Sequence, residues 1–100
     1  MSFMKNFQPI RASGVTFITG TIATNTQIPV PARDILITNE GPYAARFDLQ
    51  PDSLTSVGLS TGATINAYDK LLLGAEGMKW ISHISSNVGT QMNIVTGVGG

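Results

Sequence analysis

Short runs of β-branched and other apolar residues recur along this chain, and turns rich in glycine, proline or asparagine separate them. The runs recur at intervals of about ten to fifteen residues, a spacing typical of β-sandwiches and barrels. They are residues 15–23, 34–38, 43–49, 63–73, 78–86 and 91–96. Helical periodicity is almost absent, because glycine or proline interrupts most windows long enough to hold a helix. The pattern predicts an all-β chain.

The turn residues indicate how the strands follow one another. Residues 39–42 (Asn-Glu-Gly-Pro) predict a hairpin turn, because glycine can supply a positive φ and proline sets the φ that follows. Asn25-Thr26 is expected to end the strand that starts at Val15, and Pro29 and Pro31 place their segment in a loop or at a sheet edge. We predict about seven or eight short strands in an antiparallel β-sandwich of jelly-roll or Greek-key type.

A chain of 100 residues fits one domain, which we assign to residues 12–100. Residues 1–11 precede the first predicted strand and are interpreted as an extended N-terminal arm. Large apolar side chains on a free tail are a liability in solution. The arm is therefore expected to lie on a neighbouring subunit, with Phe3, Met4, Phe7 and Ile10 as anchors beside Arg11.

Charge is scarce in this sequence. Charged residues make up 12% of the chain, against about 25% in average soluble domains, and the formal net charge is zero. Near-neutral surfaces tend to associate, which favours a subunit of an assembly, a homo-oligomer such as a dimer or trimer. The six Lys and Arg residues are scattered, so no nucleic-acid partner is expected. No apolar run approaches the ~18 residues of a membrane span and no secretory signal is recognisable, so synthesis in the cytoplasm is expected.

Residues able to do chemistry are few. The chain has no cysteine and one histidine, His83, whose neighbour Ser82 must point to the opposite face of a strand. Asp48 and Asp52 flank a proline turn, where Asp before Ser is ordinary turn chemistry. We therefore predict no enzyme activity, no metal site and no cofactor, and interpret His83 as a half-buried strand residue.

Aromatic residues offer a second interpretation. Trp80, Tyr43, Phe47 and Tyr68 could together form a sugar-stacking platform, whereas burial in the core is the more common role of Trp and Phe. We expect Trp80 and Phe47 to fill the core. Tyr43, directly after the turn, is then the best candidate for an exposed contact residue.

The order of these pieces resembles small virion proteins of tailed bacteriophages. The shared features are a strand ending in Thr-Asn-Glu-Gly at residues 38–41, a second strand with an aromatic at residues 44–47, Trp-Ile-Ser-His-Ile at residues 80–84, and Thr-Gly-Val-Gly at residues 96–99. The resemblance extends over residues 28–99, and residues 1–11 show no matching pattern.

The resemblance implies a jelly-roll-like capsid decoration or cement protein that binds the major capsid protein on the outer surface of the virion and is made in the host bacterial cytoplasm. The arm and the loops at residues 39–43 and 54–62 would contact the capsid. The interface candidates are Phe3, Met4, Phe7, Ile10, Arg11, Asn39, Glu40 and Tyr43. The alternative is a carbohydrate- or receptor-binding β-sandwich module of a phage tail or fibre.

Overall fold

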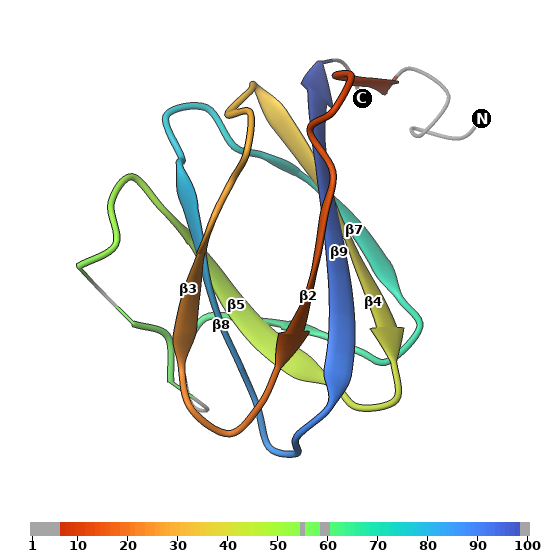
Figure 1. Cartoon of the computed structure of the whole chain (residues 1–100), viewed down its shortest axis with the longest axis vertical. Coiled ribbons are helices and arrows are strands. Elements are labelled where there is room, and N and C mark those ends of the chain that lie inside the picture. The colour runs from red at the N-terminus through yellow and green to blue at the C-terminus, as the bar shows by residue number, and fades with distance from the viewer. Residues whose placement is uncertain (1–6, 55, 59–60, 99–100) are drawn as a thin grey trace.

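The computed structural model describes residues 7–54, 56–58 and 61–98. Over these residues it contains nine β-strands and no helix, and every strand pair is antiparallel (Figure 1). The strands are β1 (Gln8–Pro9), β2 (Val15–Thr19), β3 (Thr24–Gln27), β4 (Asp34–Gly41), β5 (Ala45–Gln50), β6 (Ala63–Ile65), β7 (Lys70–Gly74), β8 (Trp80–Ser85) and β9 (Thr90–Val98).

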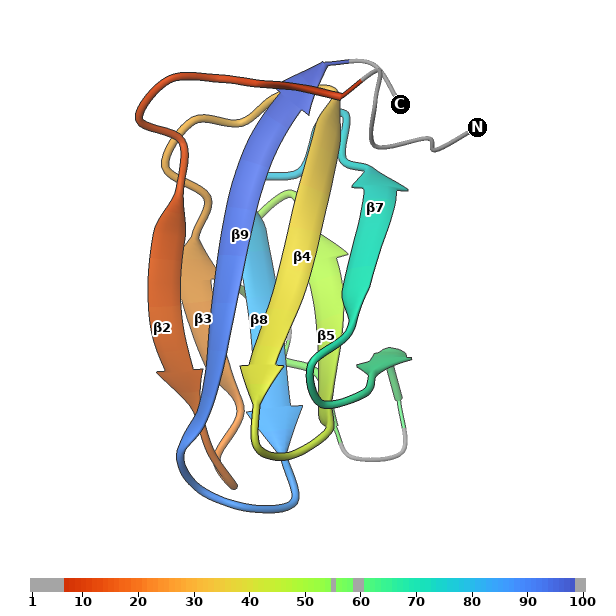
Figure 2. The same cartoon turned by 90° about the vertical axis from the view of Figure 1, so that its right-hand side faces the viewer.

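The strands form two sheets that pack face to face. In the first sheet β9 pairs with β1, β2 and β4, and β7 pairs with β4; the second sheet has the order β3-β8-β5-β6. Figure 2 shows β2, β9, β4 and β7 in front of β3, β8 and β5. The chain changes sheet at every connection from β2 to β9 except that between β5 and β6. This strand order is that of a jelly roll, as predicted.

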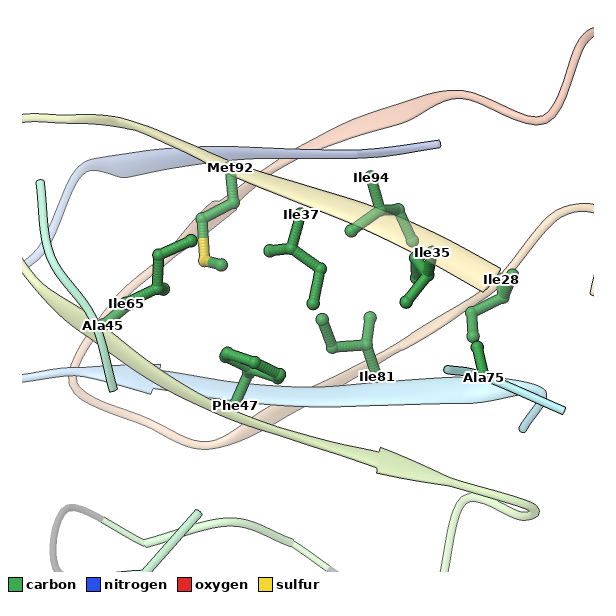
Figure 3. Packing of buried hydrophobic residues seen from close by; sticks show 10 residues of the cluster. All are labelled: Ile28, Ile35, Ile37, Ala45, Phe47, Ile65, Ala75, Ile81, Met92 and Ile94. Carbon is green, nitrogen blue, oxygen red and sulfur yellow. The ribbon is translucent and has the colours of Figure 1, made fainter. Parts of the chain in front are cut away.

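The core lies between the two sheets and follows from alternation along each strand. In β4, Ile35 and Ile37 are fully buried, whereas Leu36 between them points outward and is half-buried. Figure 3 shows side chains from both sheets meeting in one layer, which comprises Ile28, Ile35, Ile37, Ala45, Phe47, Ile65, Ala75, Ile81, Met92 and Ile94. Full burial of one such Ile or Phe side chain stabilises the fold by roughly 1.5–3 kcal/mol.

Several strand boundaries differ from the prediction; β4, for example, continues to Gly41 through residues predicted to form a turn. The first long strand ends at Thr19, where the Gly20 carbonyl instead accepts a hydrogen bond from the Ser85 amide at 2.8 Å. Asn25-Thr26 does not break a strand but lies within β3, where it pairs with Ser82 and Ile81 on β8. Short polar strands of this kind are suited to a sheet edge, where one side of the backbone faces water.

The segment predicted as an arm joins the first sheet over part of its length. Gln8 and Pro9 pair with the end of β9, and the Ile10 amide donates to the Thr96 carbonyl at 2.8 Å. Phe7 is buried, with its ring close to Gly97. The predicted arm thus includes residues that belong to the sandwich. Phe3 and Met4 lie outside the described residues.

Candidate interaction surface

Four connections meet at the end of the sandwich that lies away from the two chain termini (Figure 1). They are residues 20–23, 42–44, 66–69 and 86–89, and we call them together the loop end. Hydrogen bonds tie three of them to residues of neighbouring strands. The Ser85 amide donates to Gly20, the Thr90 hydroxyl donates to the Tyr43 carbonyl at 3.4 Å, and the Asn39 amide donates to the Asp69 carbonyl at 2.9 Å.

Large apolar side chains project into solvent from all four connections. Ile22 is 79% exposed, Tyr43 41%, Tyr68 73% and Val88 70%. Ile18, on the outer face of β2 close to the same end, is also exposed. Exposed apolar residues gathered in one region mark interaction surfaces more often than single ones do, and tyrosine is enriched at such surfaces. The loop end is therefore the candidate functional surface.

Asn39 holds the centre of the loop end in place. Its side chain is fully buried, and its Nδ2 donates to the carbonyls of Tyr43 at 2.8 Å and Ile65 at 3.1 Å. Its Oδ1 accepts from the Gly41 amide at 2.8 Å. The prediction that Asn39 contacts a partner is thus wrong, because the side chain has no exposed surface. Asn39 is instead a positioning residue for Tyr43.

Gly41 and Tyr68 make a close contact between two of the connections. Gly41 has a φ of +85°, and a Cβ at this position would overlap the ring of Tyr68. Only glycine combines that backbone angle with the absence of a side chain. The glycine of the Thr-Asn-Glu-Gly stretch therefore both closes the turn after β4 and seats the Tyr68 ring.

The other predicted interface residues lie in two separate places. Glu40 is exposed at the loop end, where its Oε1 accepts from Gln91 Nε2 at 2.7 Å, and Tyr43 is exposed as expected. Ile10 and Arg11 lie at the opposite end, beside the end of β9. Ile10 is half-buried there, and Arg11 is exposed. The buried Phe7 lies there too. The structure thus does not bring together the six candidates that lie among the described residues.

Ile22 and Val88 were missed by the sequence reasoning. Val88 lies in the connection from β8 to β9, between Asn87 and Gly89, and a Cβ on Gly20 would contact its side chain. A large apolar residue between two turn residues has no core to enter. That signal was present in the sequence and would have identified Val88, whereas Ile22 was assigned to a strand that ends earlier.

The four aromatic residues of the alternative sugar platform do not lie together. Phe47 fills the core, as expected, but Trp80 is half-buried on the outer face of the second sheet, opposite Gln27 and Gln50. Tyr43 and Tyr68 are at the loop end. The prediction that Trp80 fills the core is wrong, because the alternation along β8 points Ile81 inward and Trp80 outward.

Within the loop predicted at residues 54–62, the structure places Val57 against the outer face of the second sheet. The Val57 amide donates to Ser82 Oγ at 2.9 Å and the Val57 side chain is buried. Leu54 is 88% exposed, and its amide donates to Asp52 Oδ1 at 3.0 Å, which closes the expected turn. This loop therefore covers the sheet through one residue and exposes another.

His83 is fully buried between the sheets rather than half-buried. Its ring stacks on Phe17 with centroids 4.2 Å apart, and its Nε2 shares a 2.8 Å hydrogen bond with Thr26 Oγ1. Nδ1 has no partner among the described residues. Burial lowers the pKa of His83 from 6.5 to about 4, because the charged form would lose its hydration. The ring is therefore neutral at pH 7.

Two further features concern other kinds of site. No group of three or more His, Cys, Asp or Glu side chains in the described part of the chain is arranged to hold a metal ion. The described residues also include no helix of the length and apolarity needed to cross a membrane. In comparisons with known proteins, no family model, curated protein or solved structure matches this chain.

Proposed function

We propose that this protein is a structural binding protein that attaches to a larger protein surface through its loop end, as a decoration protein on the capsid of a tailed bacteriophage. The observation that carries the proposal is the set of exposed apolar side chains at that end, Ile22, Tyr43, Tyr68 and Val88. A buried asparagine fixes the backbone beneath them. Such a surface is pre-organised for contact, so little conformational entropy is lost on binding.

The low charge of the chain supports the same function. Charged groups lose their hydration when an interface closes, and the centres of protein interfaces are accordingly depleted in them. The charged residues at and beside the loop end are Glu40, Asp69 and Lys70, all of them exposed. Because none of the three is buried, they can stay at the rim of a closed interface while the apolar residues are covered.

The dimensions of the molecule support binding in many copies. Its extents are 34 × 29 × 22 Å, and the loop end lies at one end of the longest axis (Figure 1). The area that one end of the molecule offers is therefore at most of the order of ~800 Å², which is the area that each partner buries in a standard interface. Attachment through a dimer or trimer would strengthen the hold without new contacts, and that oligomeric state stays a prediction.

The jelly-roll order and the resemblance of residues 28–99 to phage virion proteins give the proposal its particular form. Jelly rolls occur in viral capsid proteins and equally in lectins and cupins, so the fold alone is an analogy. The carbohydrate-binding alternative loses the four-residue aromatic platform and keeps only Tyr43 and Tyr68. The capsid role is therefore preferred.

The first test is the number of copies of this chain in purified virions, measured by quantitative mass spectrometry against the major capsid protein. A ratio of the same order as the capsid protein is expected, because a decoration protein covers the shell. Complete absence of the chain from virions would overturn the proposal, and a few copies per particle would move the protein to the neck or tail.

A second measurement tests the surface itself. Shells that lack the protein are mixed with purified protein and sedimented, and the bound fraction is quantified. We expect the double variant Ile22→Ser/Tyr68→Ser to bind at least about tenfold more weakly, since hot-spot residues each account for 1.4 kcal/mol or more of binding. Leu54→Ser is the matched control, because Leu54 is equally exposed but lies away from the loop end. Equal loss in both variants would contradict the assigned surface.

A further inference from the structure

A hollow of about 260 Å³ opens on the outer face of the second sheet, over β5, β6 and β8. Arg46 is the one charged residue in its lining, which comprises Ala44, Ala45, Arg46, Thr64, Ile84, Ser85 and Ser86. The hollow is close to the loop end, since Ala44 and Ser86 border two of its connections. Its volume is below the roughly 300–1,000 Å³ of pockets for drug-sized ligands, so it suits a group of side-chain size.

Arg46 stands in the middle of the sheet with no acidic residue directly opposite it on either neighbouring strand. Its cross-strand neighbours are Thr64 on β6 and Ile84 on β8, and it is half-buried between them. Within the described part of the chain its guanidinium has no ion-pair or hydrogen-bond partner. A guanidinium presents up to five N–H donors in a rigid fork, and partial burial removes part of its hydration. The geometry leaves these donors available to a ligand.

We propose that this hollow binds a carboxylate group, held by Arg46 through two parallel hydrogen bonds. Guanidinium and carboxylate match in planarity and spacing, and such charge-assisted pairs are among the stronger hydrogen bonds in proteins. Ile84, which lies opposite Arg46 on the same face, is buried and supplies an apolar wall for the carbon atoms that carry the carboxylate. A phosphate ion has no apolar part to fill that wall, so a small organic acid or an acidic side chain fits better.

The neighbouring polar groups fix how the carboxylate enters. The Ser85 hydroxyl already donates to the Ala44 carbonyl at 2.8 Å, so it is not a donor to the ligand. Ser86 Oγ accepts from Asn87 Nδ2 at 3.3 Å and keeps its own proton to donate. Asp48 lies on the same face of β5 two residues beyond Arg46, about 7 Å along the strand. Its charge repels an anion, so the ligand enters from the side of Ala44 and Ser86.

The test is a titration of the isotopically labelled protein with sodium butyrate, followed by amide chemical shifts. Butyramide, a neutral molecule of the same shape, is the control ligand, and sodium phosphate is the control anion. We expect butyrate to shift the amides of Ala45, Thr64 and Ile84 and to bind at least about tenfold more tightly than either control, because only butyrate forms the charged pair and fills the apolar wall. Equal binding of butyrate and butyramide, or of butyrate and phosphate, would overturn the proposal.

Two variants test the role of Arg46. Arg46→Gln should lose at least about tenfold in butyrate affinity, whereas Asp48→Asn should gain a few-fold because the repelling charge is removed. Unchanged shifts in the core of β4 and β9 establish that each variant is folded. If Arg46→Gln binds butyrate as the native protein does, or if Arg46→Gln cannot fold and Asp48→Asn changes nothing, the assignment of Arg46 is wrong.

The shell-binding measurement described above distinguishes two sources of the carboxylate, an acidic side chain of the partner and a free organic acid. If it is an acidic side chain of the partner, Arg46→Gln weakens attachment to shells and butyrate competes with shells for the native protein. If it is a free acid, butyrate still binds the native protein but attachment to shells is unchanged. Failure of the virion proposal would leave the butyrate titration intact, so the two proposals fail separately.

Discussion

Asn39 and His83 are both fully buried polar residues, yet the structure around them differs. Asn39 uses both amide hydrogens and its carbonyl oxygen in three hydrogen bonds to the backbone of the loop end. His83 has one partner, Thr26, and the stack against Phe17, while its Nδ1 has no partner among the described residues. One buried residue is fully bonded and the other is only partly bonded.

The difference shows what a buried polar group can do in a small core. A buried polar side chain with all its hydrogen bonds made fixes a particular backbone geometry. Replacing that side chain with an apolar one leaves several polar groups unpaired. A buried titratable group with too few bonds stays neutral, at a cost in folding free energy. The stability of the protein then depends on any pH at which the group would take up a charge. The loop end is therefore expected to depend on Asn39 for its shape, whereas the contact between the sheets depends on pH through His83.

The largest effect is expected for Asn39→Leu. The substitution introduces a somewhat larger apolar side chain and leaves the Ile65 carbonyl and the Gly41 amide without the partner that Asn39 provides, at about 1–3 kcal/mol for each buried group. The Tyr43 carbonyl keeps only the long bond from the Thr90 hydroxyl. We expect the free energy of unfolding to fall by roughly 3–5 kcal/mol, measured by urea denaturation at pH 7. Asn66→Leu, at an exposed position in the loop after β6, should change it by less than about 0.5 kcal/mol. Equal effects would contradict the role of Asn39.

A somewhat smaller effect is expected from pH through His83. Its pKa is about 4 in the folded protein and near 6.5 when unfolded, so below pH 6.5 the unfolded chain takes up a proton that the folded protein does not. Stability is therefore complete above pH 6.5, falls as the pH is lowered towards 4, and levels off below it. We expect a total loss of roughly 2–3 kcal/mol, measured by denaturation between pH 7.5 and 4.

His83→Gln is the control for the pH dependence, because glutamine can keep the bond to Thr26 and does not titrate. Carboxylates also titrate near pH 4, and they do so in both proteins. The difference between the two pH profiles therefore isolates the histidine. Parallel profiles for the native protein and His83→Gln would show that His83 contributes nothing to the pH dependence.

The smallest effect, and one of opposite sign, is expected for Gln50→Met. Gln50 is 4% exposed, and neither of its amide atoms has a hydrogen-bond partner among the described residues. Methionine has a similar volume and no polar amide to desolvate, so the substitution should raise the free energy of unfolding by up to about 1 kcal/mol. Gln27→Met, at an exposed position of the edge strand β3, should be neutral when both variants are compared by urea denaturation at pH 7. A marked loss in Gln50→Met would point to a bond that the residue makes in solution.

Strand content and the jelly-roll class followed from the sequence because alternation and turn chemistry are local. Ile35 and Ile37 alternate with outward residues as predicted, although β4 continues to Gly41, through residues predicted to form the turn. The assignments that were wrong depended on partners distant in the chain. Asn25-Thr26 is a strand because β8 lies beside it, and Asn39 is buried because Ile65 and Tyr43 close over it.

The candidate surface was predicted only in part, and for the same reason. Tyr43 was identified because it follows a turn, but its association with Tyr68, Val88 and Ile22 arises from four connections that are far apart in sequence. The free guanidinium of Arg46 was not recognisable either, since the absence of an acidic neighbour across the sheet depends on the register of β5 with β6 and β8.

The sequence by itself determined that this chain is an all-β sandwich of low charge, because strand periodicity and turn residues act over a few neighbouring positions. Only the tertiary structure decided which polar residues are buried, which apolar residues are left in solvent, and that the predicted contact residues occupy opposite ends. These outcomes depend on the pairing of distant strands, where a shift in register by one residue exchanges the inner and outer faces.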